Sequence, residues 1–170
     1  MRGHIILLGT SHPLQCGVAP HTPSEVDNFR TYVREICSSH NIRLIAEEMS
    51  PDGLYEKKDT IACEVARDLD IQHIYIDLTK ADRKNLSISD FCLASAAHHL
   101  GTAETKDILR DMLTQRVSNP IRECCWFARI LAHNVRPTLF VCGADHIENM
   151  RGLISSVDQR VTVAHHDYAP

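Results

Sequence analysis

The sequence predicts an α/β fold, in which a mostly parallel sheet of about five strands has helices on both faces. Short apolar runs bounded by glycine turns indicate buried strands, and they alternate with longer stretches that have one apolar face. This alternation implies crossover connections, and hence parallel strands that are covered on both sides. Between the third and fourth strands, residues 87–134 are expected to form a helical insertion beside the sheet.

The first half of the chain contains three predicted strands and two predicted helices. The first strand covers residues 4–8, and a loop with three prolines follows over residues 13–23. Ser24 and Asp27 resemble a capping box and are expected to open a helix that ends near residue 39. The remaining elements are a strand over 42–46, a helix over about 55–69 and a strand over 71–76.

The second half begins with a polar connection over residues 78–86. Residues 87–117 are predicted to form one or two helices, broken near Gly101. Asn119 is the expected N-cap of a further helix to about residue 134, with Pro120 at its first position. The last elements are a strand over 138–142, a helix ending near Ser156 and a strand over 160–164. Because no linker or repeat interrupts the 170 residues, we predict a single domain.

Composition and charge indicate which classes of protein are expected and which are not. The net charge is −4 with neutral histidines and no run of lysines or arginines stands out, so neither nucleic-acid nor membrane binding is expected. The apolar run near Met1 is too short for a signal peptide, and no stretch reaches the roughly 20 apolar residues of a membrane span. The seven cysteines are odd in number and lack a C-x-x-C spacing, which favours reduced thiols in a cytoplasmic protein.

Histidines and carboxylates follow every predicted strand. Two Gly-x-x-His motifs, residues 9–12 and 143–146, stand after the first and fourth strands, and each glycine is expected to allow a sharp turn. The carboxyl ends of parallel strands meet at one edge of the sheet, where α/β proteins bind their ligands. We therefore expect a site at this edge. Its candidates are His12, Glu47, Glu48 and His146, with Asp77, His165 and His166 as outside candidates.

Imidazole and carboxylate groups together support two kinds of chemistry. They can bind a divalent metal such as Mn, Co or Zn and activate its water; the ligands would be His12, Glu47, Glu48 and His146. Without a metal, the same groups can divide the general-base and general-acid roles between them. The residue types alone leave both alternatives open.

At these positions the chain resembles the TraB/Tiki family, whose distant relatives include the erythromycin esterases and ChaN-like haem-binding proteins. That family carries two Gly-x-x-His motifs, a glutamate after an early strand, and a helix arginine before the second motif. Glu47 and Glu48 stand where the glutamate is expected. Arg122, followed by the acidic Glu123, stands where the arginine is expected. The chain departs from the family in its short length and in Trp126, where the family tends to have methionine.

The resemblance implies a hydrolase-like site. Metal-dependent proteolysis is attributed to Tiki members, and metal-free attack of water on an ester to the esterases. One glutamate would activate water or bind the metal, while His12 and His146 would bind the metal or move protons. Arg122 would stabilise negative charge on the substrate. Adjacent strand residues point to opposite sides, so only one of Glu47 and Glu48 is expected in the site, and the sequence does not say which.

Other classes of protein remain open beside a cytoplasmic hydrolase of a small-molecule or peptide substrate. One is a non-catalytic module that binds a small anionic ligand, a nucleotide or haem at the same edge, although no Walker or Rossmann glycine pattern supports a nucleotide. Another is a scaffold, which would be favoured if the strand ends did not converge. Cys16 is a further candidate nucleophile beside His12, but no cysteine-hydrolase signature surrounds it.

Overall fold

The computed structural model describes residues 3–52, 59–86, 88, 105–157 and 159–170. Its centre is a five-stranded sheet in which all strands run parallel, in the order β3-β2-β4-β1-β5. The strands are β1 (His4–Thr10), β2 (Leu44–Glu47), β3 (Gln72–Tyr75), β4 (Thr138–Gly143) and β5 (Arg160–Tyr168). The predicted α/β class with a parallel sheet is therefore confirmed.

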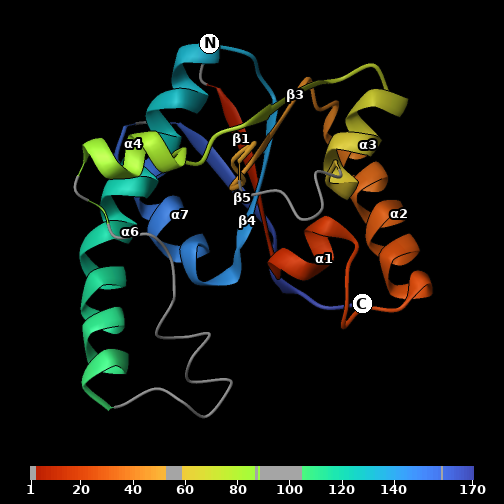
Figure 1. Cartoon of the computed structure of the whole chain (residues 1–170). Coiled ribbons are helices and arrows are strands. Elements are labelled where there is room, and N and C mark those ends of the chain that lie inside the picture. The colour runs from red at the N-terminus through yellow and green to blue at the C-terminus, as the bar shows by residue number, and fades with distance from the viewer. Residues whose placement is uncertain (1–2, 53–58, 87, 89–104, 158) are drawn as a thin grey trace.

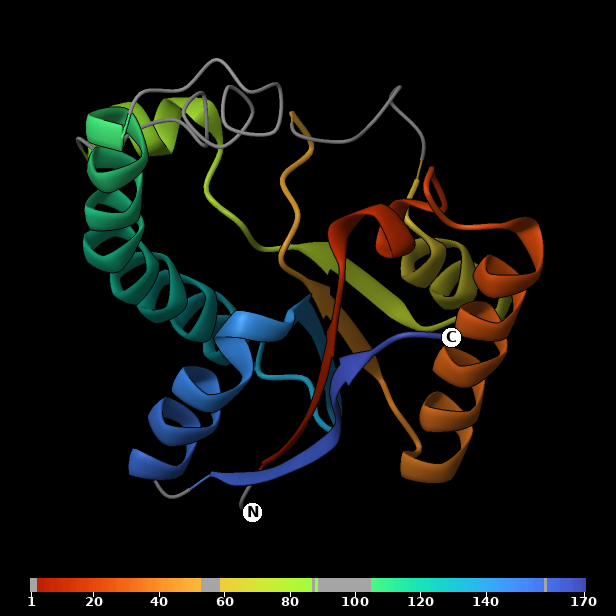
Figure 2. The same cartoon turned by 90° about the horizontal axis from the view of Figure 1, so that it is seen from below.

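Helices cover both faces of this sheet (Figures 1 and 2). On one face lie α2 (Pro23–His40) and α3 (Ile61–Asp68), beside the short α1 (His12–Cys16). On the other face lie α6 (Thr105–His133) and α7 (Ile147–Ser156). The short α4 (Lys80–Asn85) is tied to α6 by an ion pair of 3.1 Å between Asp82 and Arg129, and the 3-10 turn η2 (Ala144–His146) joins β4 to α7.

Alternate residues of β1 divide between two hydrophobic cores, because successive side chains of a strand point to opposite faces. Ile6 and Leu8 pack in the core under α2 and α3. Ile5 and Leu7 pack in the core under α6 and α7, together with Trp126. All five side chains are fully buried, and each aliphatic one contributes about 1.5–3 kcal/mol to the free energy of unfolding.

The order of the strands places a topological switch point between β1 and β4. The connections β1–β2 and β2–β3 run through α2 and α3 on one face, whereas β3–β4 and β4–β5 run through α6 and α7 on the other. β1 and β4 are nonetheless neighbours, paired from Ile5–Thr138 to Thr10–Gly143. Chains that leave adjacent strands toward opposite faces open a crevice at the carboxyl ends, where α/β proteins bind ligands.

The start of α2 differs from its prediction. The N-cap is Thr22, whose hydroxyl accepts the backbone N–H of Glu25 (3.3 Å), while the Glu25 carboxylate accepts the backbone N–H of Thr22 (2.6 Å). The predicted capping pair of Ser24 and Asp27 is wrong. Pro23 occupies the first helical position, where its missing N–H costs nothing, so the cap falls on the residue before it.

The predicted helix start at Asn119 is also wrong, because α6 continues through Asn119 and Pro120 as one helix. A proline inside a helix removes one backbone hydrogen bond. The helix is held beyond it by tertiary contacts, since Arg122 and Trp126 are buried against the sheet. The Asn119 side chain accepts a hydrogen bond from Arg122 Nη1 (3.3 Å). The predicted break near Gly101 lies outside the described residues.

Other boundaries differ as well, among them the end of β5, which runs to Tyr168 instead of residue 164. The predicted polar connection over 78–86 contains α4, and the predicted loop over 13–23 contains most of α1. α3 begins at Ile61 instead of near residue 55; residues 53–58 lie outside the described part of the chain. Within the described ranges, no helix is both long and apolar enough to cross a membrane.

Candidate active site

A cavity of about 290 Å³ opens at the carboxyl edge of the sheet, beside the ends of β1 and β4. Four of the predicted site residues line it: His12, Glu48, Arg122 and His146. His12 follows β1, Glu48 follows β2, and His146 follows β4, while Arg122 comes from α6. The structure thus brings together side chains that lie far apart in the sequence.

Glu48 connects these groups, and its side chain is only 1% exposed. Its Oε1 accepts a hydrogen bond from Arg122 Nη2 (2.8 Å) and lies 3.3 Å from His146 Nε2 and 3.8 Å from His12 Nε2. Its Oε2 accepts the backbone N–H of Gly143 (2.8 Å). The histidines of both Gly-x-x-His motifs therefore meet at one carboxylate oxygen.

The surroundings of Glu48 favour its ionised form. Burial by itself raises the pKa of a carboxyl group, because a low-dielectric environment disfavours charge. The hydrogen bond from His146 and the charges of His146, His12 and Arg122 outweigh burial and hold the pKa of Glu48 below its ordinary range. Glu48 is therefore a carboxylate at neutral pH and a weak base.

His146 is a buried cation between two carboxylates. Its Nδ1 lies 2.7 Å from Glu123 Oε1, and its Nε2 lies 3.3 Å from Glu48 Oε1. Burial alone would lower the pKa of His146, but the hydrogen bonds with Glu123 and Glu48 raise it to about 9. The Trp126 ring meets the imidazole edge to face, with ring centroids 4.9 Å apart. At neutral pH, His146 therefore donates hydrogen bonds from both ring nitrogens.

Arg122 is 3% exposed and directs its guanidinium at protein acceptors. Its Nε and Nη2 donate to the Asp77 carboxylate (3.2 and 3.0 Å), and Nη2 also donates to Glu48 (2.8 Å). The guanidinium carbon lies 4.7 Å from the centroid of the Trp126 ring. Burial would lower the pKa of Arg122, but Asp77 and Glu48 raise it. We therefore assign Arg122 a positioning role, in which it holds Glu48 in place.

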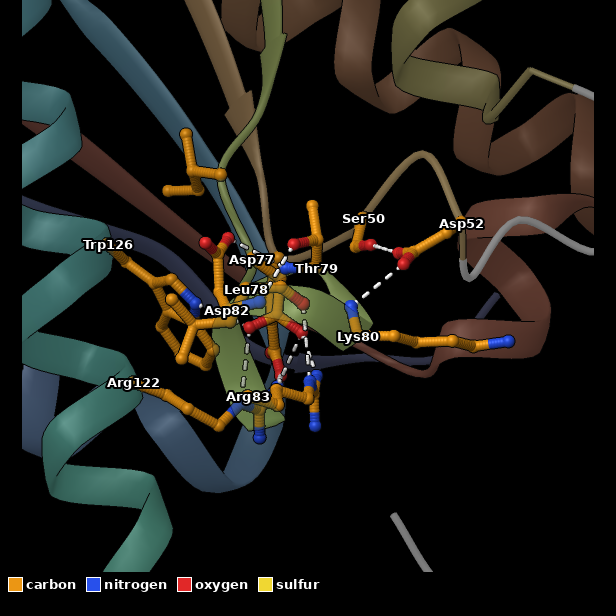
Figure 3. Close-up of polar contacts among 12 residues, drawn as sticks. Ser50, Asp52, Asp77, Leu78, Thr79, Lys80, Asp82, Arg83, Arg122 and Trp126 are labelled. Atoms are coloured by element: carbon orange, nitrogen blue, oxygen red, sulfur yellow. Dashed lines mark hydrogen bonds and ion pairs between the residues drawn. The ribbon is translucent and has the colours of Figure 1, made fainter. Parts of the chain in front are cut away.

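Asp77 is the counter-ion behind Arg122 and does not line the cavity. Figure 3 shows its carboxylate between Trp126, Arg83 and Arg122. It accepts a hydrogen bond from Trp126 Nε1 (2.8 Å) and pairs with both arginines. Although burial would raise the pKa of Asp77, the hydrogen bond and charge of Arg122 lower it. Asp77 thus acts on the cavity through Arg122.

Among the four predicted residues that line the cavity, His12 is the most exposed, with 35% of its side-chain surface accessible. It is the first residue of α1, whose N-cap Ser11 accepts the backbone N–H of Leu14 (3.3 Å). The 3.8 Å between His12 Nε2 and Glu48 Oε1 is too long for a direct hydrogen bond. Its buried Nδ1 has no hydrogen-bond partner among the described residues. His12 is therefore the imidazole best placed to exchange protons with the cavity.

The structure separates Glu47 from Glu48 by the alternation of the strand. Glu47 is fully buried away from the cavity, where its Oε2 accepts a hydrogen bond from the Thr60 hydroxyl and lies 3.0 Å from His73 Nε2. It shares no contact with the other predicted ligands His12 and His146. Glu48 is therefore the glutamate of the candidate site.

Three other candidates from the sequence lie away from the cavity. His165 packs against the ring of Tyr168, with centroids 5.6 Å apart. His166 is exposed, and its Nε2 lies 3.8 Å from Glu148 Oε1. Cys16 is buried in α1.

Glu123 is the site residue that sequence reasoning missed. Its Oε1 contacts His146 Nδ1 (2.7 Å) and accepts a hydrogen bond from Asn149 Nδ2 (3.3 Å). The sequence offered one signal, since an acidic residue follows the helix arginine in the TraB/Tiki pattern too. Glu123 lies behind His146 and does not line the cavity, whereas Asn119 and Asp167 line it and carried no such signal.

The two motif glycines serve different purposes, and neither has a positive φ. A Cβ on Gly9 would lie 1.8 Å from the backbone oxygen of His166, so a side chain here would collide with β5. A Cβ on Gly143 would meet Glu48 Oε2 at 3.4 Å, which is an ordinary contact. Gly143 contributes its backbone N–H to Glu48, while Gly9 allows β1 and β5 to approach.

The described residues contain no group of three or more His, Cys, Asp and Glu side chains placed to hold a metal ion. Glu47 lies apart from the others, and Arg122 occupies the Glu48 oxygen that faces both histidines. Among the described residues, the predicted ligands therefore do not form a preassembled set of metal donors.

Comparison with known proteins identifies no relative: no protein-family model, no curated protein and no solved structure matches this chain. The fold and site define the class of protein as a parallel α/β protein with a charged cavity at the carboxyl edge of its sheet.

Proposed function

We propose that this chain is a hydrolase that uses the cavity beside β1 and β4 to attack a carboxylic ester or amide with water. The observation that carries the proposal is the meeting of two imidazoles at one buried oxygen of Glu48, with Nε2 of His12 at 3.8 Å and Nε2 of His146 at 3.3 Å. One imidazole is open to the cavity and the other is a buried cation. Pairs of titratable groups that lie close together but in different environments are typical of catalytic sites.

His12 is the proposed general base. The 3.8 Å gap between His12 Nε2 and Glu48 Oε1 suits a water molecule that contacts both groups. As the water oxygen attacks the substrate carbonyl carbon, one of its protons passes to the imidazole of His12. That proton then passes to the leaving alcohol or amine, and the second product is a carboxylic acid. Glu48, with its lowered pKa, orients the water and balances charge.

His146 is the proposed source of electrostatic stabilisation. Its positive charge lies in the cavity wall, where it favours the oxyanion that forms on the carbonyl oxygen. Arg122 adds positive charge and fixes the carboxylate that both histidines contact. This division of roles differs from the hypothesis drawn from the TraB/Tiki resemblance, in which a glutamate activated the water and Arg122 acted on the substrate directly. That resemblance stays a prediction.

The volume of the cavity limits the size of the substrate. About 290 Å³ is near the lower end of the range for small-molecule sites, roughly 300–1,000 Å³. A small ester, or the residues on either side of one peptide bond, would fit such a space. We therefore retain a small-molecule or peptide substrate.

The test is hydrolysis of p-nitrophenyl esters of graded acyl length and of quenched fluorescent peptides. His12→Ala is expected to lower kcat/KM about 100-fold or more, because the general base is lost. His165→Ala is the matched control, since His165 is also an imidazole near a strand end but lies outside the cavity. Full activity in His12→Ala would overturn the proposal.

The two glutamates provide a second matched pair for the same assay. Glu48→Gln is expected to lower kcat/KM about 100-fold, because the carboxylate that orients the water and His146 is lost. Glu47→Gln is expected to retain activity after correction for the folded fraction. Equal losses in the two variants would contradict the assignment of Glu48.

Chelation tests the role of metal. Activity is expected to persist in EDTA, because the proposed reaction uses only side chains. Loss of activity that is restored by Mn, Co or Zn would replace this scheme with the metal-dependent hydrolysis that the sequence also allowed.

A further inference from the structure

A second cavity, of about 530 Å³, lies at the opposite edge of the sheet, where the strands begin. The segments that enter β1, β2 and β4 form its walls, and they supply His4, Arg43 and Arg136 to the lining. No acidic side chain is present among the described residues that line it. This amino-edge cavity therefore differs in charge from the candidate active site.

Arg136 is held rigidly in this cavity by one end of its guanidinium. Its Nη1 donates to the backbone oxygens of Val135 (2.6 Å) and Ile130 (3.3 Å) and to Thr138 Oγ1 (3.2 Å). A Cβ on Gly3 would lie 2.9 Å from Arg136 Nε, so the backbone at residue 3 packs closely against the guanidinium. Within the described part of the chain, Nε and Nη2 have no hydrogen-bond partner. The free side of a fixed fork thus remains available to a ligand.

The positive charge at this edge is not neutralised by the described residues. None of the ion pairs between them includes Arg43, Arg136 or Arg160. Burial lowers the pKa of Arg136, and burial together with the charges of Arg160 and His40 lowers the pKa of His4. A partly buried cation without a counter-ion is unfavourable, and a bound anion would offset that cost.

We propose that the amino-edge cavity binds a small phosphorylated anion through the guanidinium groups of Arg43 and Arg136. Guanidinium groups match phosphate oxygens in bidentate pairs, which makes arginine the preferred residue for such sites. The volume of about 530 Å³ lies within the range of roughly 300–1,000 Å³ that holds small-molecule ligands, so a phosphate ester fits as well as free phosphate. This site is separate from the hydrolase site and does not depend on it.

The test is calorimetric titration of the full chain with inorganic phosphate and with ribose 5-phosphate, at constant ionic strength and with sodium chloride as the blank. Arg43→Gln is the decisive variant, because Arg43 is exposed and its removal leaves the hydrogen bonds around Arg136 intact. We expect it to weaken phosphate binding 10-fold or more. Arg136→Lys keeps a charge but loses the fork, and the same loss is expected.

Arg151→Gln is the matched control, since it removes one exposed arginine from α7, where Arg151 pairs with Glu148 at 2.7 Å. Its affinity for phosphate is expected to stay within twofold of the unmodified chain. Tighter binding of ribose 5-phosphate than of phosphate would identify an ester as the ligand, and equal binding would identify the free anion.

Three results would overturn the proposal. They are no heat of binding for either probe at millimolar concentration, an equal loss in Arg43→Gln and Arg151→Gln, or binding that survives Arg43→Gln but is lost in His12→Ala. The last result would place the anion in the cavity at the other edge.

Discussion

His12 and His146 stand at the ends of motifs with the same spacing, and both approach the same oxygen of Glu48. Their surroundings are nevertheless different. The side chain of His12 is 35% exposed and lies 3.8 Å from Glu48, whereas that of His146 is 9% exposed and contacts Glu48 at 3.3 Å and Glu123 at 2.7 Å. The spacing of the motif therefore brings each imidazole to Glu48, while the neighbouring residues determine its burial and its contacts.

The difference arises from the elements that follow each motif. The first motif leads into α1, whose first residue is His12 at the rim of the cavity. The second leads into η2, where α6 packs behind the imidazole and supplies Glu123 and Trp126. One motif thus yields an imidazole open to the cavity, and the other yields a buried imidazole held between two carboxylates.

The largest difference between the two histidines is expected in the stability lost when each is replaced by alanine. His146→Ala is expected to lower the free energy of unfolding by about 3–5 kcal/mol, because Glu48 and Glu123 lose a buried charged partner. His12→Ala is expected to change it by less than about 0.5 kcal/mol, because His12 is partly exposed and makes no direct hydrogen bond to Glu48. Urea unfolding measures both values. Similar losses in the two variants would remove the proposed distinction.

The next largest difference is expected in the stability lost when each motif glycine is replaced by alanine. Gly9→Ala is expected to cost about 3 kcal/mol of unfolding free energy, because the new Cβ would meet the backbone of β5 and a side-chain rotation cannot relieve it. Gly143→Ala is expected to cost less than about 1 kcal/mol, since its Cβ has room and its N–H is kept. Thermal and urea unfolding of both variants provide the comparison. A larger cost at Gly143 would show that the contacts are assigned to the wrong motif.

The stability of the fold should decrease at high pH, where His146 loses its proton. A pKa raised from 6.5 to about 9 means that the folded state binds the proton more tightly than the unfolded state. This stabilisation is complete below pH 6.5 and is lost as the pH rises through about 9. We expect a loss of about 1–3 kcal/mol between pH 6.5 and pH 10, relative to His146→Gln measured in parallel. An identical pH profile in His146→Gln would contradict this expectation.

The sheet and the location of the site followed from local patterns. Apolar runs between helical stretches predicted the parallel strands, and the rule for their carboxyl ends predicted that His12, His146 and one of Glu47 and Glu48 would meet. The sequence did not predict which of Glu47 and Glu48 enters the candidate site. Both faces of β2 are buried under helices, so the strand carries no alternation of polar and apolar residues that marks a face.

The ion pairs within the site depend on contacts that local sequence does not encode. Arg122 and Asp77 are 45 residues apart, and His146 and Glu123 are 23 apart. The helix boundary at Asn119 failed for a related reason, whereas the cap at Thr22 is local. Side chains such as Trp126, buried against the sheet, extend α6 through a proline that local rules take as a helix start.

The titration of His146, followed by ¹H–¹⁵N NMR of its imidazole, tests most directly whether Glu48 organises the candidate site. In the unmodified chain the pKa of His146 should lie at about 9. In Glu48→Gln it should fall toward the ordinary range of histidine, because one of its two carboxylate partners is lost. In Glu47→Gln it should stay unchanged. A pKa that is the same in the unmodified chain and in Glu48→Gln, or that falls equally in both variants, would contradict the account.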